Sequence, residues 1–246
     1  MRAQQIELRL IYWRLEIKCL ITAQRRQSSH RRNDLLKQPS PFPNLSAAGR
    51  ELAPHLAEYE NDPDAIVLGI ALAGVPVARE VANFLHAPLD LILIRRLLIG
   101  SEVGSHICAV NVAGARILDD EIRLTETPST PLEHFLSEAI EGLGQREQVC
   151  RRGRASIELT GRTVIVVDCG IRTGSTMRVA ARAVRATQPK RMIGAVPVSS
   201  REGYETIAPL FDDLICLMQP EEFINAGRWY SDFRRAEDDQ VGVLID

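Results

Sequence analysis

The sequence is poor in aromatic residues and has no long apolar run. Phe, Trp and Tyr make up only 5% of its 246 residues. No stretch reaches the roughly 18 to 20 uncharged apolar residues of a membrane-spanning helix, so we do not expect an integral membrane protein. Hydrophobic residues make up 45% of the chain, which suffices for a buried core in one large or two small domains.

The chain also lacks a strong net charge and paired cysteines. Thirty Lys and Arg against thirty-two Asp and Glu give a formal charge of −2, so overall charge does not predict a nucleic-acid partner. No C-x-x-C pair occurs, which argues against a disulfide framework and against a zinc site. The five cysteines are scattered, at Cys19, Cys108, Cys150, Cys169 and Cys216. A reduced, cytoplasmic compartment is the simplest expectation.

The N-terminal region differs from the rest in charge. Residues 1–33 carry eight Lys or Arg and two Glu, and charges interrupt the apolar segment 8–21, unlike a secretory signal. We therefore expect a basic, partly disordered extension at 1–43 and one domain at 44–246. The favoured interpretation is that this extension is a non-conserved addition, or that it results from a wrongly chosen upstream start codon. An RNA-binding arm or a targeting segment is the alternative.

From Asn44 onward, short apolar runs alternate with amphipathic patterns. We expect a helix that starts at Asn44 or Ser46 and runs to about Tyr59, and a second helix with Pro76 in its first turn. The continuously apolar run 65–71 is typical of a strand buried on both faces of a parallel sheet. Further strands are expected at 89–94, 163–167, 192–198 and 214–217, and further helices at 131–149, 176–186 and 204–208.

This alternation predicts an α/β fold, a doubly wound and mainly parallel sheet with helices on both faces. Ligands of such sheets bind beyond the carboxyl ends of the strands. The loop 168–176 follows the strand at 163–167 and combines Asp168 with two glycines, three hydroxyls and the start of a helix. The helix amino terminus offers unpaired N–H groups to a phosphate, whereas Asp168 suits hydroxyl groups. The loop therefore predicts a ligand with a sugar diol near a phosphate; an ordinary strand-to-helix turn is the alternative.

This loop resembles the phosphoribosyl-pyrophosphate (PRPP) loop of type I phosphoribosyltransferases, which reads as apolar strand, two acids, then Thr-Gly-x-Thr. The resemblance extends beyond the loop: the chain from residue 44 to about residue 239 is similar to a bacterial group of these proteins. It includes Gly-Val-Pro-Val-Ala at 74–78, Ala-Pro-Leu-Asp at 87–90 and Trp-Tyr-x-Asp-Phe at 229–233. A P-loop NTPase is not indicated, because no Lys follows Gly174.

The resemblance implies a set of site residues. Asp168 would bind the ribose hydroxyls and the metal, and Arg172 to Thr176 would wrap the 5′-phosphate. Asp168 and Arg96 are the expected catalytic residues. In the family, a basic residue at the position of Arg95 and Arg96 helps to hold pyrophosphate. The expected substrate-binding residues are Leu72, Ala73, Gly74, Arg95, Asp168, Cys169, Gly170, Arg172, Thr173, Gly174, Ser175, Thr176 and Trp229.

The activity that the resemblance implies is transfer of the 5-phosphoribosyl group from PRPP to a nitrogenous acceptor, with Mg²⁺ as cofactor and release of pyrophosphate. The enzyme would be a glycosyltransferase of nucleotide metabolism that acts on small molecules. Homodimers are usual in this family. The alternative is a non-catalytic or regulatory protein that keeps the phosphate cradle and binds PRPP or a nucleotide.

The chain departs from the family pattern at three positions. Cys169 stands in place of the second acid, and Leu72 stands where an arginine is common in the pyrophosphate loop. Arg172 stands where purine-salvage enzymes carry an acid used toward the base, which disfavours a 6-oxopurine acceptor. Cys169 is either a small residue tolerated in a decayed site or a thiol with a lowered pKa near a helix amino terminus.

Two further groups have open roles. The aromatic residues Phe223, Trp229 and Tyr230 either stack on a planar base or pack a lid against the sheet. The arginines at 151, 152 and 154 are expected in a solvated basic loop, with phosphate binding as the alternative.

Overall fold

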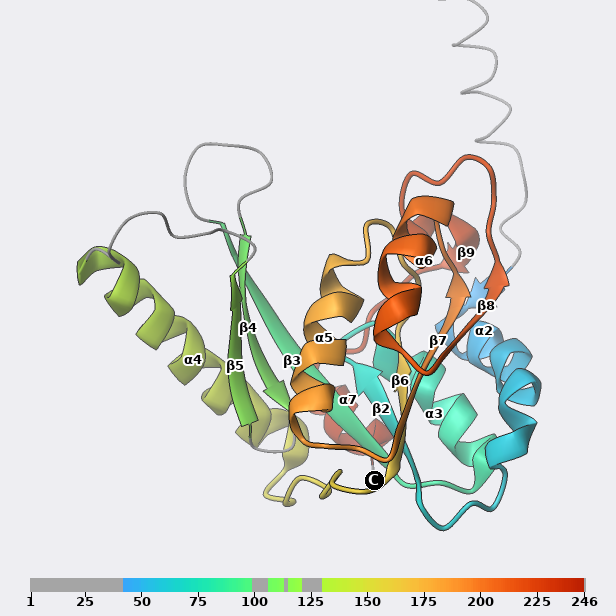
Figure 1. Cartoon of the computed structure of the whole chain (residues 1–246), viewed down its shortest axis with the longest axis horizontal. Coiled ribbons are helices and arrows are strands. Elements are labelled where there is room, and N and C mark those ends of the chain that lie inside the picture. The colour runs from blue at the N-terminus through green and yellow to red at the C-terminus, as the bar shows by residue number, and fades with distance from the viewer. Residues whose placement is uncertain (1–41, 99–105, 113–114, 121–129, 246) are drawn as a thin grey trace, which may run out of the picture. The chain divides into compact units, whose positions relative to one another are not determined.

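A seven-stranded sheet forms the centre of the described part of the chain (Figure 1). The computed structural model describes residues 42–98, 106–112, 115–120 and 130–245. The strand order is β5-β4-β3-β2-β6-β7-β8, and the ladder from β3 to β8 is parallel. The strands are β2 (Ala65–Ile70), β3 (Leu89–Leu98), β4 (His106–Val112), β5 (Ala115–Asp120), β6 (Thr163–Val167), β7 (Arg191–Val198) and β8 (Asp213–Met218).

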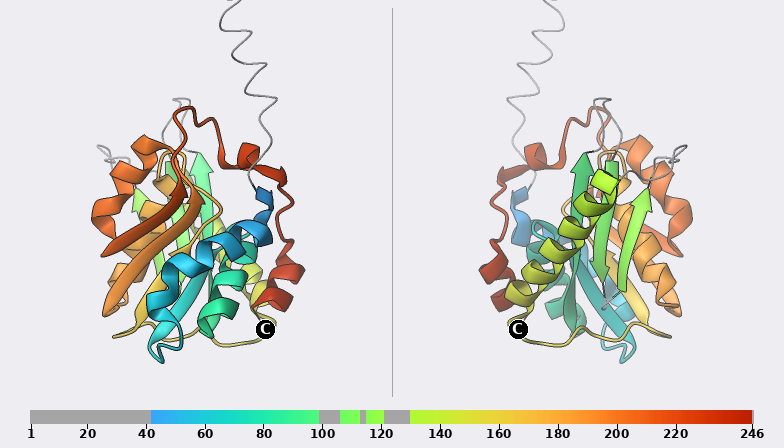
Figure 2. Two further views of the ribbon diagram at one scale, coloured as in Figure 1. Left: turned by 90° about the vertical axis from the view of Figure 1, so that its right-hand side faces the viewer. Right: turned by 90° about the vertical axis from the view of Figure 1, so that its left-hand side faces the viewer.

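Helices cover both faces of this sheet, as the sequence predicts (Figure 2). One buried cluster includes Val67 and packs under α2 and α3, and the other includes Ile66 and Leu68 and packs under α5 and α6. Every residue of β2 and β6 is buried, which is why these strands read as continuous apolar runs. The helices are α2 (Leu45–Leu52), η1 (Ala53–Tyr59), α3 (Gly74–Leu85), α4 (Thr130–Arg151), α5 (Ser175–Ala186), α6 (Arg201–Ile207), η2 (Ala208–Leu210), η3 (Ala226–Trp229) and α7 (Asp238–Leu244).

The first expected helix forms, but in two parts. Asn44 is its N-cap, and the Asn44 side chain accepts a hydrogen bond from the amide of Ala47 at 2.8 Å. Ser46 lies inside the helix. The chain tightens into the 3₁₀ helix η1 at Ala53, because Pro54 cannot donate a backbone hydrogen bond.

The edge of the sheet at β3–β5 was not predicted. The strand expected at 89–94 continues to Leu98, and β4 and β5 add to it as antiparallel strands. Arg95 and Arg96 interrupt the apolar run of β3, which made its end look earlier than it is. The sheet is therefore mainly parallel with an antiparallel edge.

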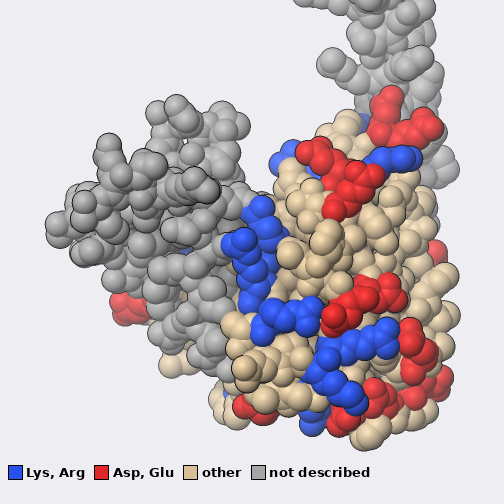
Figure 3. All heavy atoms as spheres, viewed as in Figure 1, with Lys and Arg blue, Asp and Glu red and all other residues tan. Residues whose placement is uncertain are grey.

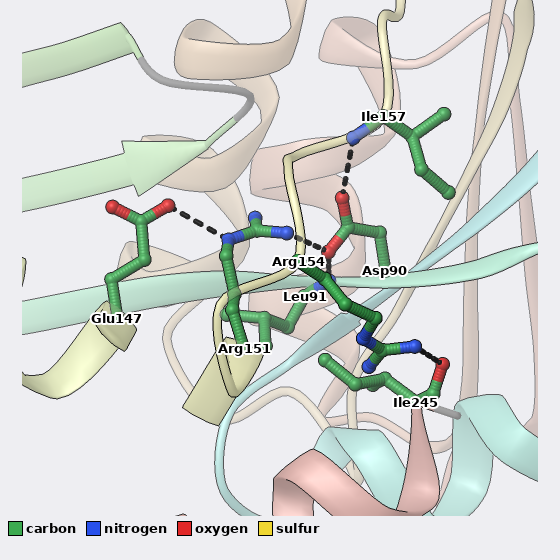
Figure 4. Close-up of polar contacts among 7 residues, drawn as sticks. All are labelled: Asp90, Leu91, Glu147, Arg151, Arg154, Ile157 and Ile245. Carbon is green, nitrogen blue, oxygen red and sulfur yellow. Dashed lines mark hydrogen bonds and ion pairs between the residues drawn. The ribbon is translucent and has the colours of Figure 1, made fainter. Parts of the chain in front are cut away.

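The expectation of a solvated basic loop is wrong for Arg151. Arg151 is the last residue of α4 and is 5% exposed. Its guanidinium pairs with buried Asp90 at 2.6 Å and with Glu147 at 2.8 Å (Figure 4). Asp90 also accepts a hydrogen bond from the amide of Ile157 at 2.9 Å. This network ties the end of α4 and the following segment to the first residues of β3.

A small second sheet joins the two ends of the described domain. β1 (Phe42–Asn44) pairs in parallel with β9 (Tyr230–Asp232). Phe42 and Pro43 lie within the expected extension, whereas the rest of that extension is outside the described residues. Among the helices of the described residues, none has both the length and the apolar character that crossing a membrane requires.

Candidate functional site

The loop 168–174 leaves the carboxyl end of β6 and is held against β7. Ile171 forms a parallel bridge with Ser199, and the Ile171 amide donates to the carbonyl of Val198 at 3.0 Å. The Ser200 amide in turn donates to the Ile171 carbonyl at 2.8 Å. The first part of the loop therefore continues the pairing of β6 with β7 beyond the carboxyl ends of these strands. Helix α5 begins only at Ser175.

Two glycines allow this loop to fit between its neighbours. Gly170 and Gly174 have φ angles of +156° and +79°, which residues with a Cβ rarely adopt. A Cβ on Gly170 would lie 2.8 Å from the Cβ of Ala226, and one on Gly174 would lie 2.5 Å from Cγ2 of Ile207. The loop is thus packed between η3 on one side and α6 on the other.

The loop and the first turn of α5 line an open pocket of about 120 Å³. The first intrahelical hydrogen bond runs from the Arg178 amide to the Gly174 carbonyl at 2.8 Å. The N–H groups before it have no partner inside the helix. Among the described residues, the amides of 172–176 make no backbone hydrogen bond elsewhere. The lining residues are Asp168, Gly170, Ile171, Arg172, Thr173, Gly174, Ser175, Thr176 and Met177. This arrangement can bind a phosphate.

Asp168 lies at the end of β6, where the pyrophosphate loop expected at 72–74 meets it. Its Oδ1 accepts a hydrogen bond from the Cys169 amide at 2.7 Å. A Cβ on Gly74 would lie 2.7 Å from the Val167 carbonyl oxygen and 3.4 Å from Oδ1 of Asp168. The peptide between Ala71 and Leu72 is cis. The structure thus brings Gly74 and Asp168 together.

Cys169 does not line the pocket, although it was expected among the substrate-binding residues. It is 8% exposed and belongs to the core cluster that contains Tyr230. Burial raises the pKa of the Cys169 thiol well above its ordinary value, and the neighbouring Asp168 charge raises it further. The interpretation of Cys169 as a thiol with a lowered pKa is therefore wrong.

Tyr230 packs beneath the loop and holds its main chain. Its hydroxyl donates to the carbonyl of Cys169 at 2.5 Å, and it is 4% exposed. The ring lies 5.5 Å from that of Phe42 and 5.3 Å from that of Phe233. Burial raises the pKa of the Tyr230 hydroxyl. Of the two roles considered for the aromatic residues, Tyr230 has the packing role; Trp229 is half-buried against the same core.

The cationic residues expected at the site are not all brought to it. Arg172 is exposed and lines the pocket. The Arg95 guanidinium instead contacts α4 at Gly142. The Arg96 side chain lies outside the described residues. Leu72 packs against the core, so the loop 72–74 presents no charged side chain.

The surface beside the pocket carries charges of both signs. Lys and Arg side chains gather over α5, whereas Asp and Glu gather over α6 (Figure 3). α5 contains Arg178, Arg182 and Arg185 and no acidic residue. The basic side of this surface favours the approach of an anionic ligand, and the acidic side opposes it.

The described residues contain no cluster of three or more His, Cys, Asp or Glu side chains that could hold a metal ion. Asp168 is the carboxylate that lines the pocket. A cation at this site would therefore need most of its ligands from a bound substrate or from water.

Comparisons with known proteins agree with this geometry. The family model described as "Phosphoribosyl transferase domain" matches residues 41–228. Proteins from two strains of Mycobacterium tuberculosis, CDC 1551 and H37Rv, carry the name "Putative phosphoribosyl transferase". Each is 34% identical over 206 residues, which are 83% of this chain. The chain spans only 46% of the length of these relatives.

A solved structure shows the same fold. The crystal structure of TT1426 from Thermus thermophilus is 30% identical, with a TM-score of 0.71. The match covers 83% of this chain and 97% of that one. Together with the family model, which covers more than half of the chain, these relatives confirm the resemblance seen in the sequence. The chain belongs to the type I phosphoribosyltransferase family.

Proposed function

We propose that the protein binds PRPP at the pocket 168–177 and transfers its 5-phosphoribosyl group to a nitrogenous acceptor. The observation that carries the proposal is one pocket lined both by a carboxylate, Asp168, and by the amide-rich start of α5. A ribose phosphate needs both features, because its hydroxyls donate to a carboxylate and its phosphate accepts from N–H groups.

The reaction breaks the bond between ribose C1 and the pyrophosphate oxygen and forms a bond from C1 to the acceptor nitrogen. Main-chain amides and the hydroxyls of Thr173, Ser175 and Thr176 would hold the 5′-phosphate. Asp168 would accept hydrogen bonds from the ribose hydroxyls at the other end. Because both ends of the sugar are fixed, C1 is oriented toward the acceptor without a covalent intermediate on the protein.

Asp168 also suits a magnesium ion, which binds proteins through one or two carboxylates and completes its shell with substrate phosphates and water. The ion would offset the negative charge on the departing pyrophosphate. Asp168 would hold it together with ribose and pyrophosphate oxygens of the substrate.

Binding without transfer is a second candidate, and the pyrophosphate end of the site favours it. Leu72 replaces a cation there and packs against the core, and Arg95 lies against α4. Losing a charge-assisted hydrogen bond costs on the order of 1.5 to 3 kcal/mol. A protein with this site would bind a ribose 5-phosphate group more readily than it stabilises leaving pyrophosphate.

Isothermal titration with PRPP, with and without Mg²⁺, tests the shared part of both candidates. We expect binding that Asp168→Asn weakens and that the remote, exposed control Asp239→Asn leaves unchanged. Pyrophosphate release, measured with a panel of nitrogenous bases, then separates the two. Release with any base supports transfer, whereas PRPP binding with no release supports binding alone. Absence of PRPP binding contradicts both.

A further inference from the structure

Ser200 contacts the loop 168–174 from the start of α6. It lies between β7 and α6 in the chain. Its amide donates a hydrogen bond to the Ile171 carbonyl at 2.8 Å, and its hydroxyl donates to the Arg172 carbonyl. Ser200 is not among the described residues that line the pocket. One residue behind the loop therefore binds two successive carbonyls of it.

These two hydrogen bonds set the direction of the amides that follow. The peptide units after Ile171 and Arg172 are trans, and in a planar trans unit the N–H points opposite to the C=O. Because both carbonyls point to Ser200, the N–H groups of Arg172 and Thr173 point away from it. Within the described part of the chain, neither of these N–H groups donates a hydrogen bond. Both can therefore donate to a ligand.

The hydroxyl of Ser200 is itself held in one orientation. Its oxygen accepts a hydrogen bond from the Gly203 amide at 2.9 Å, which makes Ser200 the N-cap of α6. A serine hydroxyl has a single hydrogen to donate, and this one goes to the Arg172 carbonyl. Gly203 leaves room for the approach, because a Cβ there would lie 2.5 Å from the Arg172 carbonyl oxygen. One hydroxyl thus joins α6 to the loop, as acceptor on one side and donor on the other.

Capping alone does not account for both bonds. An N-cap side chain needs only to accept from a helix amide, as Asn44 does from Ala47 in α2. The bond from Ser200 to Arg172 adds nothing to the cap, but it fixes the loop before a ligand arrives. Binding to a fixed loop costs less conformational entropy than binding to one that must first be ordered.

We infer that Ser200 is a positioning residue for the 5′-phosphate. Its hydroxyl holds the loop so that the amides of Arg172 and Thr173 face the ligand, and it acts through the main chain without touching the ligand. This inference rests on the proposed phosphoribosyl site. In the competing interpretation, Ser200 only caps α6 and affects the site through stability alone.

Calorimetric titration of the full chain with ribose 5-phosphate tests the inference. Ser200→Ala should bind this probe about 3- to 10-fold more weakly, because the Arg172 carbonyl loses its donor. Ser200→Thr keeps the hydroxyl and should bind within about twofold of the unchanged protein. Ser200→Gly should weaken binding as Ser200→Ala does, although glycine caps a helix almost as well as serine. It gives the answer even where Ser200→Ala fails to fold.

Asn44→Ala is the matched control, because it removes an N-cap from a helix that does not contact the loop's carbonyls. It should lower stability and keep the affinity for ribose 5-phosphate. Unchanged affinity in Ser200→Gly, or no recovery in Ser200→Thr, overturns the positioning role. Equal weakening in Asn44→Ala assigns the effect to stability and overturns it too. Failure of the unchanged protein to bind ribose 5-phosphate contradicts the proposed function itself.

Discussion

The hydroxyl of Tyr230 donates a hydrogen bond to the carbonyl of Cys169, 61 residues earlier in the chain. The Cys169 amide donates in turn to the carboxylate of Asp168. The C-terminal strand β9 is thereby coupled to the residue proposed to bind ribose. At position 169 both of these hydrogen bonds are made by main-chain atoms, not by the side chain.

Replacing Tyr230 with Phe should weaken both the fold and the site. The change leaves the buried Cys169 carbonyl without its donor, which costs about 1 to 3 kcal/mol of unfolding free energy. Affinity for a nucleoside monophosphate should fall as well, because the turn at Asp168 is less well fixed. Denaturant unfolding and calorimetry measure the two effects. Tyr204→Phe is the control, since it removes the bond to the Leu214 carbonyl, which lies away from the loop. Unchanged affinity in Tyr230→Phe would contradict the coupling.

Introducing an acid at Cys169 should destabilise the protein and should not improve ligand binding. The family pattern has an acid at this position, but the side chain of residue 169 lies in the core. Cys169→Asp should therefore destabilise the protein by burying a charge, and the loss should shrink as the pH falls toward the carboxyl pKa. Cys169→Ala should keep nucleotide binding. Mass spectrometry should find Cys169 resistant to iodoacetamide in the native protein at pH 7. Tighter nucleotide binding by Cys169→Asp would show that the carboxylate reaches the pocket.

Gly74→Ala should weaken ligand binding directly, and not only through a loss of protein stability. The new Cβ would lie 2.7 Å from the Val167 carbonyl and must displace the segment that carries Asp168. We expect at least tenfold weaker PRPP binding by calorimetry, about 1.4 kcal/mol. Gly153→Ala is the control: no atom lies within 4 Å of its new Cβ, although Gly153 itself has a positive φ of +84°. That variant should lose some stability and keep its affinity. Equal affinities in both variants would be evidence against a close approach of Gly74 to the site.

Arg151→Met should be strongly destabilising, because it leaves the Asp90 carboxylate buried without its cation. Breaking one partner of a buried pair typically costs about 3 to 5 kcal/mol. The double variant Asp90→Leu with Arg151→Met should cost less than the single one. The exposed pair Arg234–Asp232 is the control, and Arg234→Gln should leave the denaturation midpoint unchanged. A small loss in Arg151→Met would mean that solvent reaches Asp90.

The parts of the fold that follow from local pattern were predictable. β6 was expected at 163–167 and has those bounds, because a strand buried on both faces is apolar throughout. Asn44 was one of two N-cap candidates and caps α2, because this interaction spans only three residues. The loop at 168–174 was found for the same reason: its strand, glycines and hydroxyls are consecutive.

The parts that depend on distant residues were not predictable. The burial of Arg151 requires Asp90, and the sequence places these residues 61 positions apart. The inward side chain of Cys169 depends on Tyr230, whose strand pairs with β1 at the other end of the domain. Arg95 and Arg96 looked equivalent in sequence. The structure places the Arg95 guanidinium against α4 at Gly142, a contact that no local pattern indicates.

A crystal structure of the protein with a bound nucleoside monophosphate tests the central claim most directly. The account predicts the phosphate within hydrogen-bond distance of the amides of residues 173–176 and the ribose hydroxyls beside the Asp168 carboxylate. A phosphate bound elsewhere on the domain, with the pocket at 168–177 left to solvent, would contradict it.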